Sequence, residues 1–136
     1  MASIIIPTMR YRDAHRMINW LGKAFGFERH LVVEDDQGGV AHAQLILGDS
    51  MIMLGTARDD EFGRLMKTAA DLGGVSQSAY IIVADVDGLC DSARAAGAEI
   101  VIEPRDEGYG GRGFTCRDPE GQLWSFGSYD PWTVRG

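Results

Sequence analysis

The stretch Arg117-Asp118-Pro119-Glu120-Gly121-Gln122-Leu123-Trp124 contains the most specific local pattern in this chain. Asp-Pro-Glu-Gly favours a tight turn, because proline presets one backbone angle and glycine adopts left-handed conformations without strain. Residues 112–117 and 122–129, on either side of the turn, include aromatic and hydroxyl-bearing side chains that suit strands. The stretch therefore predicts a β-hairpin.

The residues before this hairpin predict a strand, a helix and a second strand. An aspartate is a favourable first cap for the helix, and Gly97 is the expected stop. The predicted elements are a strand over 79–84, a helix from Asp85 or Asp87 to Ala96, a strand over 98–103 and a charged, glycine-rich loop over 104–111.

The N-terminal half shows the same order of elements. Asp13 is the predicted cap of a helix that ends before Gly26, and its apolar residues recur at helical spacing. These residues are Ala14, Met17, Ile18, Leu21 and Phe25. The other predicted elements are strands over 4–11, 27–34, 40–47 and 50–54, with turns at 35–39 and at Gly48-Asp49.

The order strand, helix, strand, strand, strand thus occurs twice. Gly26-Phe27-Glu28 in the first copy corresponds to Gly97-Ala98-Glu99 in the second. Such a repeat predicts an α+β fold of two βαβββ modules, in which paired modules enclose a cleft and the helices lie outside. We expect the modules at 1–55 and 78–136, with a linker at 56–77 that carries a short helix around Phe62, Leu65, Met66 and Ala69.

Composition excludes several functional classes. The chain has 136 residues, 13 Lys and Arg, 20 Asp and Glu, and a net charge of -7. This charge disfavours nucleic acid and anionic membranes as partners. No apolar run approaches the roughly 20 residues that a membrane span needs. Without a recognisable signal peptide, and with Cys90 and Cys116 expected to stay reduced, the sequence predicts a cytoplasmic domain.

The repeat and its motifs resemble the vicinal oxygen chelate superfamily, which includes glyoxalase I, bleomycin-resistance proteins and extradiol dioxygenases. The residues that carry the resemblance are Asp85-Val86-Asp87, Ala95-Ala96-Gly97-Ala98-Glu99, the stretch 117–124, and Gly48-Asp49-Ser50-Met51-Ile52-Met53-Leu54. The resemblance covers nearly the whole chain. It implies a cleft for a small molecule and a homodimer, since modules of this family often pair between chains.

The resemblance also implies a divalent metal held by His, Gln or Glu on four strands. Carried over one at a time, those positions fall on Ile6, Met53, Ala79 and Ser125. None of these side chains suits a hard or borderline divalent ion, which prefers imidazole or carboxylate. We therefore predict no metal and no cofactor.

Strand alternation predicts which residues face the cleft. The Gly48-Asp49 turn should pair Leu47 with Ser50, so that Gln44 lies opposite Met53. In the last hairpin we expect Arg117 to pair with Gln122, which places Cys116 opposite Leu123 and Phe114 opposite Ser125. The predicted ligand-binding residues are Thr8, His42, Gln44, Met51, Met53, Arg112, Phe114, Cys116, Leu123 and Ser125, with Tyr109 as a possible lid.

Individual residues have alternative interpretations. His42 is the best candidate for an acid or base, or else a half-buried histidine without chemistry. Arg112 either clamps a carboxylate or carbonyl oxygen or pairs with a nearby acidic side chain. Met51 and Met53 either form an adaptable binding surface or belong to the core. Cys116 lacks a base adjacent in sequence, which disfavours nucleophilic catalysis.

Two functions follow. The first is metal-free binding of a small, partly aromatic molecule, an antibiotic or a toxic metabolite, that is sequestered in the cleft, as the resemblance to bleomycin-resistance proteins implies. The second is a lyase, isomerase or dioxygenase similar to glyoxalase I, using a divalent metal or His42 as base. The unsuitable side chains at the metal positions favour the first.

Overall fold

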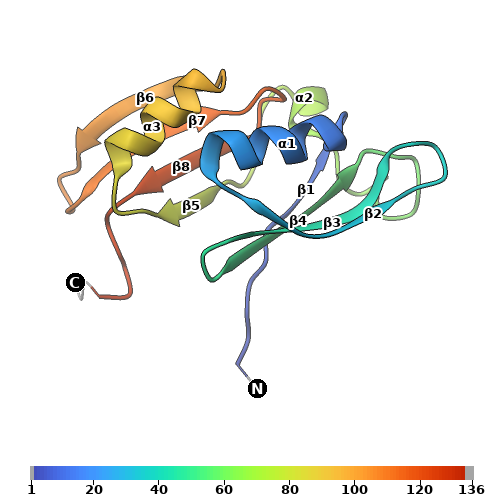
Figure 1. The fold of residues 1–136 in the computed structure, drawn as a ribbon, viewed down its shortest axis with the longest axis horizontal. Coiled ribbons are helices and arrows are strands. Elements are labelled where there is room, and N and C mark those ends of the chain that lie inside the picture. Colours follow the sequence, from blue (N-terminus) through green and yellow to red (C-terminus); the bar gives the residue numbers. More distant parts are fainter. Residues whose placement is uncertain (1, 134–136) are drawn as a thin grey trace. The chain divides into compact units, whose positions relative to one another are not determined.

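The first module contains one four-stranded mixed sheet and one long helix, as predicted (Figure 1). The structure, a computed structural model, describes residues 2–133; Met1 and residues 134–136, at the outer ends of the two predicted modules, lie outside the described part. The sheet has the order β1-β4-β3-β2, with β1 parallel to β4 and the other pairs antiparallel. The elements are β1 (Thr8–Tyr11), α1 (Ala14–Phe25), β2 (Glu28–Glu34), β3 (Val40–Leu47) and β4 (Ser50–Thr56).

Helix α1 begins and ends where the sequence predicts. The Asp13 carboxylate accepts a hydrogen bond of 3.1 Å from the backbone N–H of Arg16 and so caps the first turn. Gly26 ends the helix with a φ of 89°, a left-handed conformation that glycine adopts without the steric cost of a Cβ atom. The apolar side of α1 is buried, and it includes Ala14, Met17, Ile18, Leu21 and Phe25.

The core of the first module lies between α1 and one face of this sheet. Alternate side chains of β1, β3 and β4 are buried on the face that α1 covers: Met9, Tyr11, Ala43, Leu45, Ile52 and Leu54. Fully burying side chains of this size stabilises a fold by about 1.5 to 3 kcal/mol each, relative to leaving them in water. This packing fixes which face of the sheet is left for a ligand.

The linker contains less helix than its apolar spacing predicts. Only α2 (Ala69–Leu72) is helical, with the Thr68 hydroxyl accepting from the backbone N–H of Asp71. The expected helix around Phe62 is replaced by turns, in which the Asp60 carboxylate accepts a hydrogen bond from the N–H of Gly63. Aspartate competes in this way with helical hydrogen bonding. The chain divides into two units between Gly73 and Gly74.

The second module repeats the same topology, with the sheet order β5-β8-β7-β6 and β5 parallel to β8. Asp85, one of the two predicted caps, accepts from the N–H of Gly88 and begins the helix. Strand β6 runs three residues beyond its predicted end at Glu103, which shortens the glycine-rich loop. The elements are β5 (Ala79–Ile82), α3 (Val86–Ala95), β6 (Glu99–Asp106), β7 (Arg112–Arg117) and β8 (Leu123–Gly127).

The register of the last hairpin corrects the sequence analysis. Arg117 pairs with Leu123 rather than Gln122, so the connection is one residue longer than predicted. Asp118 is the cause, because its buried carboxylate accepts hydrogen bonds from the backbone N–H groups of Glu120 and Gln122, at 2.9 and 3.0 Å. It also accepts from the indole N–H of Trp124, at 3.0 Å. These donors hold the turn in its longer form.

This shift by one residue reverses the predicted face of every β7 side chain. Phe114 and Cys116 are 2% and 0% exposed, and they lie with Trp124 and Phe126 on the face that α3 covers. Their predicted place in a ligand site was therefore wrong.

A similar shift affects β5. Ala79 lies beside Trp124 and Tyr80 lies beside Ser125, so Ala79 faces the helix and Tyr80 shares the face of Ser125. The position carried over from the family to Ala79 was therefore misplaced by one residue. Among the described residues, no helix is long and apolar enough to cross a membrane.

Candidate functional site

The first module presents one sheet face that α1 does not cover, and we call it the open face. The pairing predicted from the Gly48-Asp49 turn is confirmed: Leu47 pairs with Ser50, and Gln44 with Met53. Strand alternation and the observed register place ten side chains on the open face. They are Thr8 and Arg10 of β1, Glu28, Leu31 and Val33 of β2, His42, Gln44 and Ile46 of β3, and Met51 and Met53 of β4.

The open face combines an apolar surface with a few hydrogen-bonding groups. Met51, Met53, His42 and Gln44 are half-buried. Leu31 and Val33 of the outer strand are 44% and 45% exposed. The one acidic side chain among these ten is Glu28, which pairs with Ile46 at the end of the sheet away from Arg10. Small-molecule sites have this character, with apolar walls and a small number of polar groups that fix orientation.

His42 and Gln44 are hydrogen-bonded to each other on this face. The Gln44 Nε2 group lies 3.0 Å from His42 Nε2. An amide nitrogen only donates, so in this arrangement the imidazole nitrogen is the acceptor. The Nε2 lone pair is therefore occupied, and His42 acts as a base through that nitrogen only after Gln44 rotates away.

Arg10 is a member of the open face that the sequence analysis missed. Its Nη1 group donates to the backbone carbonyl of Thr56 at 3.3 Å, and its guanidinium carbon lies 5.3 Å from the centre of the Phe62 ring. Gly55, the β4 partner of Arg10, makes this possible. A Cβ atom on Gly55 would lie 3.1 Å from the Ala41 carbonyl oxygen and 3.2 Å from Nη1, so a side chain at this position would crowd the guanidinium where it crosses β4.

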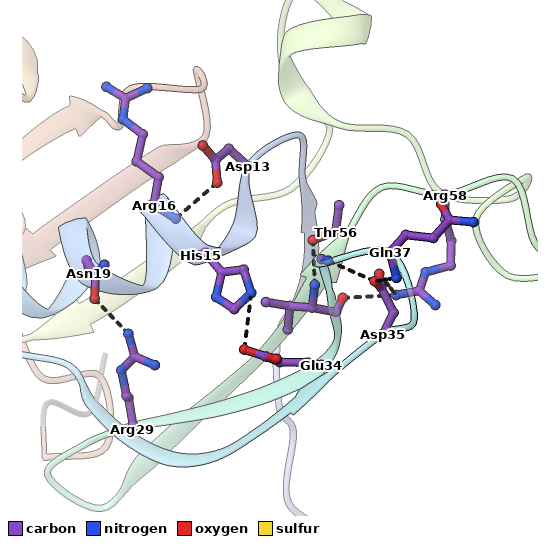
Figure 2. Close-up of polar contacts among 12 residues, drawn as sticks. Asp13, His15, Arg16, Asn19, Arg29, Glu34, Asp35, Gln37, Thr56 and Arg58 are labelled. Carbon is purple, nitrogen blue, oxygen red and sulfur yellow. Dashed lines mark hydrogen bonds and ion pairs between the residues drawn. The ribbon is translucent and has the colours of Figure 1, made fainter.

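A polar network fixes the neighbouring end of the same sheet (Figure 2). Asp35 accepts from the N–H groups of Gln37 and Gly39, both at 2.8 Å, and these bonds hold the pKa of its carboxyl below the usual value. Arg58 donates to Asp35 at 3.1 Å and to the carbonyl of Val40 at 3.0 Å. Asp35 in the β2–β3 connection and Arg58 after β4 thus form an ion pair with each other, so we interpret this network as structural.

The three histidines occupy different places. His15, on α1, lies 3.7 Å from the Glu34 carboxylate of β2, on the helix side of the sheet (Figure 2). His30 is an exposed β2 residue at a register irregularity between Arg29 and Leu31. His42 is the histidine that the register places on the open face.

The second module has a corresponding uncovered face, which we call the hydroxyl face. It includes Tyr80, Ile82, Ile102, Thr115, Leu123 and Ser125, together with the ion-paired Arg117 and Glu99 beside Leu123. The Thr115 and Ser125 hydroxyls are hydrogen-bonded at 2.8 Å. The Tyr80 hydroxyl crosses Gly127 and donates to the carbonyl of Tyr129 at 2.7 Å. Burial, and then the neighbouring phenol of Tyr109, raises the pKa of Tyr80. Leu123 and Ser125 thus lie on an uncovered face as predicted.

Arg112 does not join either uncovered face. Its guanidinium makes two hydrogen bonds to Asp87 at the start of α3, at 2.8 and 2.9 Å, and a longer one to Asp106 at 3.4 Å. The Arg112 hydrogen bonds hold the pKa of Asp87 below its usual value. The alternative considered for Arg112, an ion pair with a nearby acidic residue, is confirmed, and the predicted ligand clamp is not.

Tyr109, the predicted lid, is 62% exposed and packs edge-on against Tyr129, with ring centres 5.0 Å apart. Its role over a ligand stays a prediction, as does the cleft expected between the modules.

The two cysteines are unsuited to nucleophilic chemistry. Both side chains are buried and unpaired by any disulfide. Burial raises the pKa of Cys90, and it raises the pKa of Cys116 to about 12. A thiol reacts through its thiolate, so both groups are inert near neutral pH.

The side chains at the family's metal positions do not fit a divalent ion. Met53 and Ser125 are on uncovered faces, but a thioether and a neutral hydroxyl are weak ligands for such ions. Within residues 2–133, no group of three or more His, Cys, Asp or Glu is placed to hold a metal.

Comparison with known proteins gives one family. The sequence pattern of the family described as "Glyoxalase/Bleomycin resistance protein/Dioxygenase superfamily" matches residues 4–126. The chain is 31% identical over 121 residues to Mb0911c, an uncharacterized protein of Mycobacterium bovis, covering 89% of this chain and 80% of that protein. It has the same identity to the uncharacterized protein Rv0887c of Mycobacterium tuberculosis, covering 71% of that protein.

Solved structures share the architecture. TioX from Micromonospora sp. ML1 is 30% identical, with a TM-score of 0.71, and the match covers 93% of this chain and 98% of TioX. The fosfomycin resistance protein FosX of Listeria monocytogenes is 12% identical, with a TM-score of 0.69 and coverage of 96% and 93%. FosX was solved in complex with Mn(II) and dihydroxypropylphosphonic acid. At 12% identity this likeness concerns the fold alone.

Proposed function

This chain belongs to the glyoxalase/bleomycin resistance protein/dioxygenase superfamily, and from that premise we propose that it binds a small, partly aromatic molecule on its open face without a metal ion. The proposed role is sequestration of the bound molecule, an antibiotic or a toxic metabolite. The observation that carries the proposal is the open face itself, which places two methionines beside a hydrogen-bonded histidine and glutamine.

The apolar side chains of the open face supply the affinity. Met51, Met53 and Ile46 line adjacent strands, and thioether side chains adapt to the shape of an aromatic ring. Burying apolar ligand surface stabilises a complex by roughly 25 cal/mol per Å², before the entropic cost of association. His42 and Gln44 then select the orientation of the ligand through hydrogen bonds.

Independence from metal is supported by the donor set. The positions carried over from the family, with Tyr80 in place of Ala79, hold an isoleucine, a methionine, a tyrosine and a serine, and none of these is an imidazole or a carboxylate. The occupied lone pair of His42 favours binding over the alternative in which His42 is a catalytic base.

A fluorescent probe tests this proposal. Phenylnaphthylamine is neutral, aromatic and brighter in apolar surroundings, so chelator-treated protein should bind it with saturable enhancement. Met53→Lys introduces a charge among the apolar side chains. A bound aromatic probe would displace water from this charge, and the cost in free energy should weaken binding at least tenfold. Leu65→Lys is the matched control, because Leu65 is an exposed linker residue that is not part of the open face.

The titration has two outcomes that contradict the proposal. One is binding that requires added Ni, Zn, Mn or Fe(II) at about one ion per chain. The other is a Met53→Lys variant that binds the probe as the unmodified chain does.

We also propose that the chain forms a homodimer. The open face and the hydroxyl face expose several large apolar side chains: Leu31, Val33, Tyr80, Ile82 and Ile102. Contiguous exposed apolar surface commonly marks a binding or association site. Closed twofold dimers are the most frequent assemblies of soluble proteins.

A further inference from the structure

We propose that Arg10 makes the open face selective for aromatic anions, with the oxyanion of the ligand bound by its guanidinium and the ring lying on Met51 and Met53. This inference rests on the proposed function and names the class of molecule bound. It is carried by the placement of Arg10 on the open face, with its guanidinium held by Thr56 and Phe62.

The guanidinium of Arg10 is held in place before any ligand arrives. One nitrogen donates to the Thr56 carbonyl at 3.3 Å, and the group lies 5.3 Å from the centre of the Phe62 ring. Gly55 provides the space in which it crosses β4. A donor that is already ordered loses less entropy when it binds a ligand than a free surface side chain does.

No carboxylate neutralises this guanidinium among the described residues. Seven arginines in the described part of the chain form ion pairs with aspartate or glutamate: Arg12, Arg58, Arg64, Arg94, Arg105, Arg112 and Arg117. Arg10 is half-buried and forms none. A guanidinium has five N–H donors, so after its bond to Thr56 it retains donors for a ligand oxygen.

The positions of the other polar groups on the open face also favour an aromatic anion as the ligand. Arg10 lies beside Gly55 on β4, and His42 on β3 shares this face through its pairing with Val33. Strands lie about 4.8 Å apart, so Arg10 and His42 are separated by about two strand spacings. Gln44 and Met53 form the next pair along the same strands. An oxyanion at Arg10 therefore places an attached ring over the methionines.

Two probes with the same aromatic skeleton test the selectivity. Anilinonaphthalene sulfonate carries an oxyanion, and phenylnaphthylamine is its neutral counterpart. The unmodified chain should bind the sulfonate about tenfold more tightly than the neutral probe, a difference of about 1.4 kcal/mol, because hydrogen bonds between ionised groups are stronger than neutral ones. Arg10→Gln should abolish this preference, so that the two probes bind with equal affinity.

The controls separate local contact from general charge. Arg16→Gln removes the same charge from an exposed position on α1, and it should leave the preference intact. Arg10→Lys keeps the charge but lacks the planar fork, so it should retain a smaller preference. It also serves as the folded variant if Arg10→Gln is unstable.

Several outcomes would overturn the inference. They are an equal affinity of the unmodified chain for both probes, a preference that survives Arg10→Gln, or an equal loss in Arg16→Gln. Failure of both probes to bind would reject the proposed function as well. Binding of the neutral probe without a preference rejects only the selectivity.

Discussion

Asp118 shows how one side chain determines the shape of a hairpin. Its buried carboxylate accepts from two backbone N–H groups and from the Trp124 indole, and the charge is thereby solvated by the protein itself. This arrangement lengthens the turn by one residue and so decides which β7 side chains enter the core. The residue is thus structural, although it lies within the family's most recognisable stretch.

Replacing Asp118 with alanine should destabilise the fold by about 3 kcal/mol, because three donors lose their acceptor and a buried indole N–H is left unsatisfied. Urea unfolding measures this change. Asp49→Ala removes a carboxylate from an exposed turn residue and should have an effect near zero. Equal effects of the two substitutions would show that the Asp118 hydrogen bonds are not what stabilises the hairpin.

At the scale of single residues, the sequence predicted some open-face positions and missed others. His42, Gln44, Met51 and Met53 were predicted because a two-residue turn fixes their register. Arg10 was missed because its significance depends on Gly55, a partner distant in sequence that only the β1–β4 pairing brings alongside. A lone arginine in a strand otherwise resembles any solvated charge.

The side chain of Arg112, on strand β7, donates two hydrogen bonds to the Asp87 carboxylate in the first turn of helix α3. An acidic residue there also interacts favourably with the helix dipole. The hydrogen bonds from Arg112 lower the pKa of Asp87 in the folded chain below the ordinary value of 3.8. The unfolded chain therefore binds the proton at a higher pH than the folded chain does.

The sign of the pH dependence follows. The contribution of Asp87 to stability is fully present above about pH 4 to 5 and is lost as the pH falls through its lowered folded-state pKa. Asp87→Asn should therefore lose less stability than the unmodified chain on acidification from pH 5 to pH 3, as measured by urea midpoints. Asp91→Asn on the same helix is the control. A parallel decline in Asp87→Asn and the unmodified chain would contradict this assignment.

Secondary-structure elements were predicted well where local chemistry defines their ends. The two helices have aspartate caps, and the β3 bounds agree because glycine-containing turns flank that strand. The linker helix and the last hairpin were predicted poorly. In both segments an aspartate side chain accepts a hydrogen bond from the backbone and so favours a turn other than the predicted structure. These residues are Asp60 in the linker and Asp118 in the hairpin. Spacing of apolar residues does not report such bonds.

The whole molecule is an internal repeat, and the repeat extends to the uncovered faces. In each module one side chain of the first strand passes over a glycine of the last strand. Arg10 of β1 passes over Gly55 of β4, and Tyr80 of β5 passes over Gly127 of β8. The first module places a cation there, and the second places a phenol. The two faces are thus built alike but differ in chemistry.

The proposed homodimer is testable at this scale. Light scattering of the purified chain should give twice the chain mass of 14.8 kDa at micromolar concentration. Ile82→Lys places a charge on the hydroxyl face and should shift the mass toward the monomer. Leu65→Lys should leave it unchanged. A monomeric mass at all concentrations would reject the dimer.

The central claim is that the open face binds an aromatic molecule without metal. The most direct measurement is a titration of chelator-treated protein with phenylnaphthylamine, in which the NMR chemical shifts of the backbone amides report where the probe binds. The account predicts saturable shifts concentrated in residues 42–53, on β3 and β4, and their loss in Met53→Lys. Shifts confined to other elements, or shifts that appear only after a divalent ion is restored, would contradict it.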